Sequence, residues 1–237
     1  MTLDELVAQL KTAHGNALAG VIVYGSTATD MTAKKGHNVV VVVHTLDLAA
    51  MQADGAIGRS WQEAGNAVPL TLTDAEWRSS VDVFAIEHAD IAERHRVVFA
   101  ADGFAVSDRV SIRDEDVRRQ LEYESLALLL SVRSGIVAAG RDVSARRALL
   151  ASQASRAIAM FRATVRLSGA APAGDAEAVC AQAATVVGFD PAPFVAAHLQ
   201  RRKTKEVPKA ELDSTLGRFH SGLARLVAYV DTRSHDR

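Results

Sequence analysis

Continuous apolar runs mark the strands that we predict in the first hundred residues. The runs at 19–24 and 38–44 are almost purely aliphatic, and the second is nearly all valine. Strands with this composition are typically buried on both faces of a sheet. Weaker apolar runs predict three further strands, at 68–72, 83–89 and 96–100.

Stretches with helical spacing separate these runs. Thr2 and Glu5 form a capping-box pair ahead of an amphipathic stretch, which predicts the first helix. Residues 46–65 predict a weaker helix, and the pair Thr73 and Glu76 predicts a short one. Strands and helices in this mixed order, with short connections, indicate a sheet layered with helices, of the α+β or α/β class.

After Ser111 the strand pattern stops and helical spacing continues to the end of the chain. We predict a long helix that Ser111 caps and Gly140 closes, and a second long helix after it. Shorter helices at 176–187 and 191–202 precede a last helix that starts near Pro208. Apolar residues in the last helix alternate by four and three, which is typical of an up-and-down bundle.

The change in spacing predicts two domains, at residues 1–105 and 111–232. The 27 lysines and arginines nearly balance the 28 aspartates and glutamates, which argues against general nucleic-acid binding. The longest aliphatic runs are far shorter than the roughly 20 residues that cross a bilayer. The acidic N-terminal sequence also lacks a signal-peptide pattern. We therefore expect a globular, cytoplasmic protein that does not bind membranes.

Cysteine and histidine positions give no metal-binding pattern. The single cysteine, Cys180, cannot form an internal disulfide, and we expect it to be a small apolar core residue. His37 and His44 are seven residues apart on one predicted strand, so they lie on opposite faces of it. The sequence contains no zinc-type spacing and no Walker-type or Gly-x-Ser-x-Gly loop. We assign no metal ligands.

One stretch carries candidate chemistry. The apolar run 21–24 ends in Gly25 and Ser26, and eleven residues later a second strand begins at Asn38. This arrangement resembles the nucleotidyltransferase superfamily that contains aminoglycoside nucleotidyltransferases and small nucleotidyltransferase antitoxins. In the signature of that family, a strand ends in Gly-Ser and a second strand begins Ser-Asp-x-Asp. The glycine and serine bind phosphates, and the two aspartates hold magnesium.

The resemblance implies an α+β fold: a nucleotidyltransferase-like mixed β-sheet domain with flanking helices, followed by an all-α helical bundle domain. It also implies that Gly25, Ser26 and Asn38 bind the nucleotide. Asn38 takes the place of the first aspartate of the signature, and Val40 takes the place of the second. Asparagine offers a neutral carbonyl oxygen and valine offers no ligand, so magnesium should bind poorly.

A third carboxylate, on a neighbouring strand, usually serves that family as the base for the acceptor hydroxyl. Glu87 is the best candidate for this catalytic role, with Asp82 as the second candidate. A structural interpretation stays open, in which Glu87 lies at a sheet edge and pairs with an arginine. The segments 82–91 and 93–99 also look like the strand pair of a set of bacterial nucleotidyltransferase-domain proteins that continue into an all-helical second half.

Three hypotheses of function follow. The first is a pseudoenzyme that keeps a relic or weak cleft for a nucleotide or phosphate and has a binding or regulatory role. The second is an active transferase that uses magnesium and a nucleoside triphosphate to modify a small molecule or protein. The third is an interaction module of the toxin–antitoxin type, in which the helical domain forms a homodimer or binds a protein partner. Replacement of both aspartates favours the first hypothesis.

Overall fold

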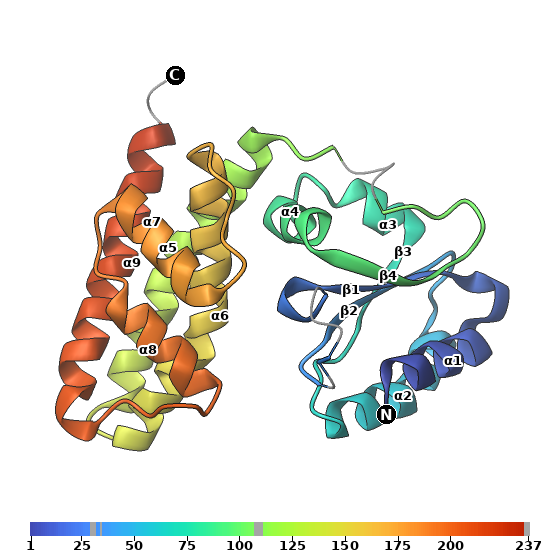
Figure 1. Cartoon of the computed structure of the whole chain (residues 1–237), viewed down its shortest axis with the longest axis horizontal. Helices are drawn as coiled ribbons and strands as arrows, with labels where there is room; N and C mark the ends of the chain where they lie inside the picture. The colour runs from blue at the N-terminus through green and yellow to red at the C-terminus, as the bar shows by residue number, and fades with distance from the viewer. Residues whose placement is uncertain (29–31, 34, 107–110, 235–237) are drawn as a thin grey trace. The chain divides into compact units, whose positions relative to one another are not determined.

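The computed structural model describes residues 1–28, 32–33, 35–106 and 111–234. The chain divides into two compact units, residues 1–113 and residues 114–237, which we call the sheet unit and the helical unit. Within the described residues, every strand belongs to the sheet unit, and the helical unit is built from helices (Figure 1). The predicted α+β class, with a mixed sheet followed by an all-α region, is confirmed.

The sheet unit alternates helices and strands. Its elements in chain order are α1 (Leu3–His14), β1 (Leu18–Tyr24), β2 (Asn38–Val43), α2 (Leu48–Glu63), β3 (Leu70–Thr73), α3 (Asp74–Ser79), α4 (Ala85–Glu93) and β4 (His95–Ala100). Both predicted capping boxes are present. The hydroxyls of Thr2 and Thr73 accept the N–H groups of Glu5 and Glu76, whose carboxylates accept the threonine N–H groups in return.

The strands are arranged in the order β3-β2-β1-β4, with β1 antiparallel to both of its neighbours and β2 parallel to β3. Figure 1 shows α1 and α2 on one face of the sheet and α3 and α4 on the other. Val41 belongs to an apolar cluster with Trp61 on the first face, while Val40 packs with Trp77 and Ile91 on the second. Burial on both faces explains why the central strands are continuous aliphatic runs.

The prediction of a strand at 83–89 is wrong, because these residues lead into helix α4. The helix buries Ala85, Ile86 and Ala89, positions that recur at helical spacing. A short apolar run does not distinguish a strand from a buried helix, and alanine and glutamate favour the helix. The next predicted strand is present as β4.

The helical unit consists of α5 (Asp114–Ala139), α6 (Val143–Leu167), α7 (Ala176–Val187), α8 (Ala192–Arg201), the short turn η4 (Lys209–Glu211) and α9 (Leu212–Ser234). Ser111 does not cap α5, which begins three residues later. Four aromatic rings lie at the centre of the unit, with neighbouring centroids between 4.5 and 5.1 Å apart: Phe161, Phe189, Phe194 and Phe219. None of the helices in the described ranges is both long and apolar enough to span a membrane.

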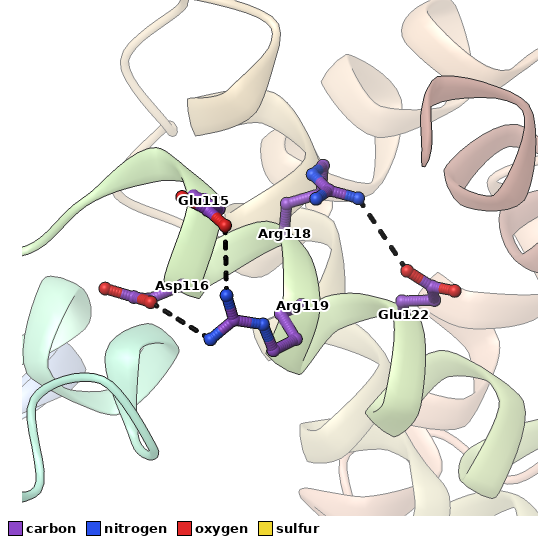
Figure 2. Close-up of polar contacts among 5 residues, drawn as sticks. All are labelled: Glu115, Asp116, Arg118, Arg119 and Glu122. Carbon is purple, nitrogen blue, oxygen red and sulfur yellow. Dashed lines mark hydrogen bonds and ion pairs between the residues drawn. The ribbon is translucent and has the colours of Figure 1, made fainter. Parts of the chain in front are cut away.

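Ion pairs fix the first turns of α5 (Figure 2). Arg119 contacts Glu115 at 3.0 Å and Asp116 at 3.4 Å, and Arg118 contacts Glu122 at 3.8 Å. Negative side chains at the start of a helix interact favourably with its dipole. Pairs one turn apart each add about 0.2–0.5 kcal/mol to helix stability. These charges favour a helix that begins at the acidic residues rather than at a serine cap.

Candidate functional site

The candidate phosphate-binding turn follows β1 directly. Gly25 has φ of +78°, in the left-handed region that favours glycine. Its N–H donates to the carbonyl of Arg94 at 3.0 Å, and its own carbonyl accepts the N–H of Ala28 at 3.1 Å. The backbone of this turn therefore requires glycine at position 25. The side chain of Ser26, the other predicted phosphate ligand, lies outside the described part of the structure.

Asn38 reaches the same turn from β2. It is the first residue of that strand and pairs with Tyr24, the last residue of β1. Its half-buried side chain leans toward the glycine, since a Cβ on Gly25 would lie 3.4 Å from Asn38 Nδ2. The structure thus brings two of the predicted nucleotide-binding residues together. The amide supplies the turn with a neutral hydrogen-bond donor and acceptor.

Val40 points to the same face of β2 as Asn38, because side chains alternate along a strand. It is 0 % exposed and packs in an apolar cluster with Ile22, Trp77 and Ile91. Magnesium takes oxygen ligands and is usually bound through one or two carboxylates, together with waters and substrate phosphates. A neutral amide at 38 and a buried alkyl group at 40 therefore do not fit the magnesium site of the signature that the sequence resembles.

Two carboxylates reach this end of the sheet from α4. Glu87 is exposed on that helix, and Asp90 lies one turn further along it. Burial raises the pKa of Tyr24, and the negative charges of Glu87 and Asp90 raise it further. Glu87 therefore acts electrostatically on the residue that pairs with Asn38, although it does so from a helix rather than from the predicted strand.

The second predicted carboxylate is less closely connected to the turn. Asp82 is exposed in the bend that precedes α4. Among the described residues, no hydrogen bond or ion pair links it to Gly25 or Asn38. The catalytic role of Asp82 thus stays a prediction from the sequence.

Sequence reasoning missed three polar residues near the turn. Asp90 is separated from Glu87 by one helical turn, a relation that appears only when the segment is known to be a helix. His95 pairs with Tyr24 across β1 and β4, and its Nδ1–H donates to the carbonyl of Ile91 at 2.8 Å. Thr27 follows the Gly-Ser pair directly, and its buried hydroxyl has no hydrogen-bond partner within the described ranges.

The sequence matches no family model and no curated protein. Among solved structures it is similar to a nucleotidyltransferase-like protein from Exiguobacterium sibiricum, over 99 % of this chain and 81 % of that one. The two chains are 13 % identical, and the TM-score is 0.37. A likeness at this level assigns neither a family nor an activity.

The polar groups around the turn are therefore of two kinds. Neutral donors come from the Asn38 amide and the Tyr24 phenol, whose raised pKa keeps it protonated at neutral pH. Negative charge comes from Glu87 and Asp90. Within the described residues, no three His, Cys, Asp or Glu side chains are grouped closely enough to hold a metal ion. Neutral donors can bind phosphate oxygens, whereas the carboxylates oppose a high negative charge on the ligand.

Proposed function

We propose that the protein is a nucleotidyltransferase-fold binding protein that does not perform metal-dependent transfer. It would bind a nucleotide or other phosphate ligand weakly at the Gly25 turn. The observation that carries this proposal is the pair of residues at 38 and 40, an amide beside the turn and a valine inside the core. In the family that the sequence resembles, these positions hold the metal that neutralises the triphosphate. Without that metal, binding serves recognition or regulation.

The strength of this binding follows from the groups at the turn. The Asn38 amide and the Thr27 hydroxyl each offer a hydrogen bond, worth about 1 kcal/mol. Glu87 and Asp90 repel added negative charge. We therefore expect weak affinity, and no advantage of a nucleoside triphosphate over the corresponding monophosphate.

Titration calorimetry with ATP, GTP, CTP and UTP tests the proposal, in EDTA and again in magnesium. We expect the affinity to be the same in both buffers, because the turn lacks a pair of metal-binding carboxylates. A tenfold gain with magnesium would overturn the proposal. A labelled-nucleotide assay with small-molecule and protein acceptors should show no transfer in magnesium or manganese. Robust transfer that Glu87→Gln abolishes would establish the enzyme hypothesis instead.

A pair of matched variants tests where the nucleotide binds. Gly25→Ala strains a left-handed residue and brings a methyl group to 3.4 Å from the Asn38 amide. Gly169→Ala imposes similar strain at φ of +86° in the helical unit, with no atom within 4 Å of the new Cβ. Only the first variant should lower nucleotide affinity. Asn38→Ala should lower it about fivefold, the loss of one hydrogen bond. Equal effects of the two glycine variants would contradict this location.

A second candidate function, homodimerisation, is supported by an apolar seam on α5. The exposed fractions of Tyr123, Leu126, Leu130 and Val137 are 72 %, 46 %, 49 % and 82 %. Their spacings of three, four and seven residues are typical of a helix that packs against another. A two-fold axis with antiparallel α5 helices would pack the seam of one subunit against the same seam of its partner. By contrast, the large apolar residues of α9 that alternate by four and three, from Leu212 to Val230, are buried within one chain.

Light scattering over a range of concentrations tests the dimer. We expect a concentration-dependent mass that Leu130→Lys shifts to the monomer, because a charge would then lie in the seam. Ser152→Lys, on the exposed surface of α6, should leave the mass unchanged. A strict monomer at every concentration would exclude this function.

A further inference from the structure

A pocket of about 450 Å³ opens in the helical unit between α7, α8 and the segment 202–211. Sites for small molecules usually have volumes of about 300–1,000 Å³ and mostly apolar walls. The walls here are largely aliphatic, formed by Ala181, Val195, Ala196, Leu199, Val207 and Pro208. Size and lining both match a small-molecule site.

The segment that closes one side of the pocket is held in place from two helices. The N–H of Val207 donates to Oε1 of Gln200 on α8 at 2.8 Å. Its carbonyl accepts from Nε and Nη2 of Arg147 on α6 at 2.9 and 2.8 Å. Arg147 also forms an ion pair with Glu206, at 2.9 Å. Because both polar groups of this residue's backbone are fixed, the pocket is formed before any ligand binds.

Two of the charged side chains that line the pocket are neutralised by neighbours. Glu206 is paired with Arg147, and Arg218 is paired with Asp190 at 2.9 Å. These pairs leave no net charge of their own to attract a ligand. The electrostatic preference of the pocket is therefore set by the remaining charges on its rim.

The remaining charges are negative in excess. Glu177, Glu211 and Lys205 line the pocket, and none of them has an ion-pair partner among the described residues. The unpaired charges of the lining are thus two carboxylates and one ammonium group. Glu177 lies in the first turn of α7, where a negative side chain interacts favourably with the helix dipole. Thr215, only 3 % exposed, adds a buried polar residue to the lining.

We propose that this pocket binds a small organic cation, an ammonium group carried on an apolar body. The apolar body would be buried against Ala196, Leu199 and Val207. The ammonium group would lie beside Glu177 and Glu211, which form no ion pair among the described residues. An anionic ligand of the same shape would be repelled by two carboxylates and attracted by only one lysine. This site lies in the helical unit and does not depend on the nucleotide-binding proposal.

Three isosteric probes test the proposal by calorimetry on the full chain: 2-naphthylmethylammonium, 2-naphthylmethanol and 2-naphthoate. We expect the cation to bind at least tenfold more tightly than the anion at low salt, with the neutral alcohol between them. Added salt should narrow the difference, because charges on the rim are screened. Equal affinities for the three probes, or tighter binding of the anion, would overturn the charge preference.

Variants of the pocket separate the apolar contact from the charge. Ala196→Leu should abolish binding of all three probes by filling the pocket, with an unchanged circular dichroism spectrum. Glu177→Gln and Glu211→Gln should each weaken the cation several-fold and leave the alcohol unaffected. Glu63→Gln, an exposed acid in the sheet unit with the same change in net charge, serves as the control. Binding that survives Ala196→Leu in the folded protein would overturn the site.

Discussion

At the scale of single residues, the sheet unit contains a buried histidine, His88. Its burial opposes protonation of the side chain. His88 is 3 % exposed, shares a hydrogen bond with Ser80 Oγ at 3.1 Å, and lies 4.5 Å from the ring of Trp77. Burial lowers its pKa below the ordinary value of 6.5. The unfolded chain therefore binds a proton more readily than the folded one. The stability that neutral His88 provides is complete above pH 6.5 and is lost as the pH falls through the lower folded pKa.

Urea unfolding followed by tryptophan fluorescence checks this direction. Between about pH 7.5 and about pH 5, the free energy of unfolding should fall more for the wild type than for His88→Gln. His44→Gln, which alters an exposed histidine, should keep the wild-type dependence. Identical pH dependence in all three proteins would show that His88 is not a source of acid sensitivity.

Val40 should tolerate a smaller apolar side chain but not a charge. Val40→Asp places a carboxylate in a fully buried apolar cluster and should destabilise the sheet unit by at least about 3 kcal/mol. Val40→Ala should cost about 2 kcal/mol, the loss of buried methyl groups. Introducing aspartates at both 38 and 40 should thus unfold this unit rather than create a magnesium site. A stable Val40→Asp protein, measured by urea unfolding, would contradict this.

At the scale of elements, glycines set the distance between neighbouring helices. A Cβ on Gly222 of α9 would lie 2.6 Å from Phe194 on α8. Gly217 lies on the same helix, and a Cβ there would have no atom within 4 Å. Gly222→Ala should therefore destabilise the helical unit by about 1–3 kcal/mol, because the aromatic cluster must move. Gly217→Ala should stabilise it by about 0.5–1 kcal/mol, since alanine favours a helix.

Thermal unfolding followed by circular dichroism measures both glycine variants. Both variants replace glycine with alanine on the same helix, and only the atoms around the new Cβ differ. Opposite shifts in melting temperature would therefore show how much packing at Gly222 contributes to stability. Melting temperatures that move together would mean that helix propensity alone decides the outcome.

The elements that can be predicted from sequence are those whose signals are local. Helix α7 begins and ends where its spacing predicts, with the Asp175 side chain capping its start and Gly188 in a left-handed conformation at its end. Helix α4 cannot be predicted in this way, because a short apolar run leaves strand and helix equally open. The contact between Gly25 and Asn38 follows from two strand ends that meet. The approach of Glu87 and Asp90 to Tyr24 depends on packing, which no local pattern specifies.

At the scale of the whole molecule, each unit has its own core and its own spectroscopic signal. Both tryptophans of the chain, Trp61 and Trp77, are buried in the sheet unit. The long helices of the helical unit contribute most of the helical circular dichroism. Fluorescence and circular dichroism therefore report on different parts of the chain. If the two units unfold separately, the unfolding curves measured by the two signals will not coincide.

We expect Val40→Ala to lower mainly the urea midpoint of the fluorescence transition. Gly222→Ala should lower mainly the midpoint of the circular dichroism transition, because it acts in the other core. Each variant is the control for the other. If either substitution shifts both transitions equally, the two units unfold as one cooperative body.

Cys180, the only cysteine of the chain, is 0 % exposed on α7. Burial raises the pKa of its thiol to about 12, with smaller contributions from Glu177 and Asp175. Alkylating reagents react with exposed thiolates, so native Cys180 is protected both by its protonation and by its surroundings. Alkylation of Cys180 therefore requires α7 to separate from the helices packed against it. The rate at which the protein gains the mass of one alkyl group therefore measures the rate of local opening around Cys180. The measurement uses a cysteine that the chain already contains, so no probe residue has to be introduced.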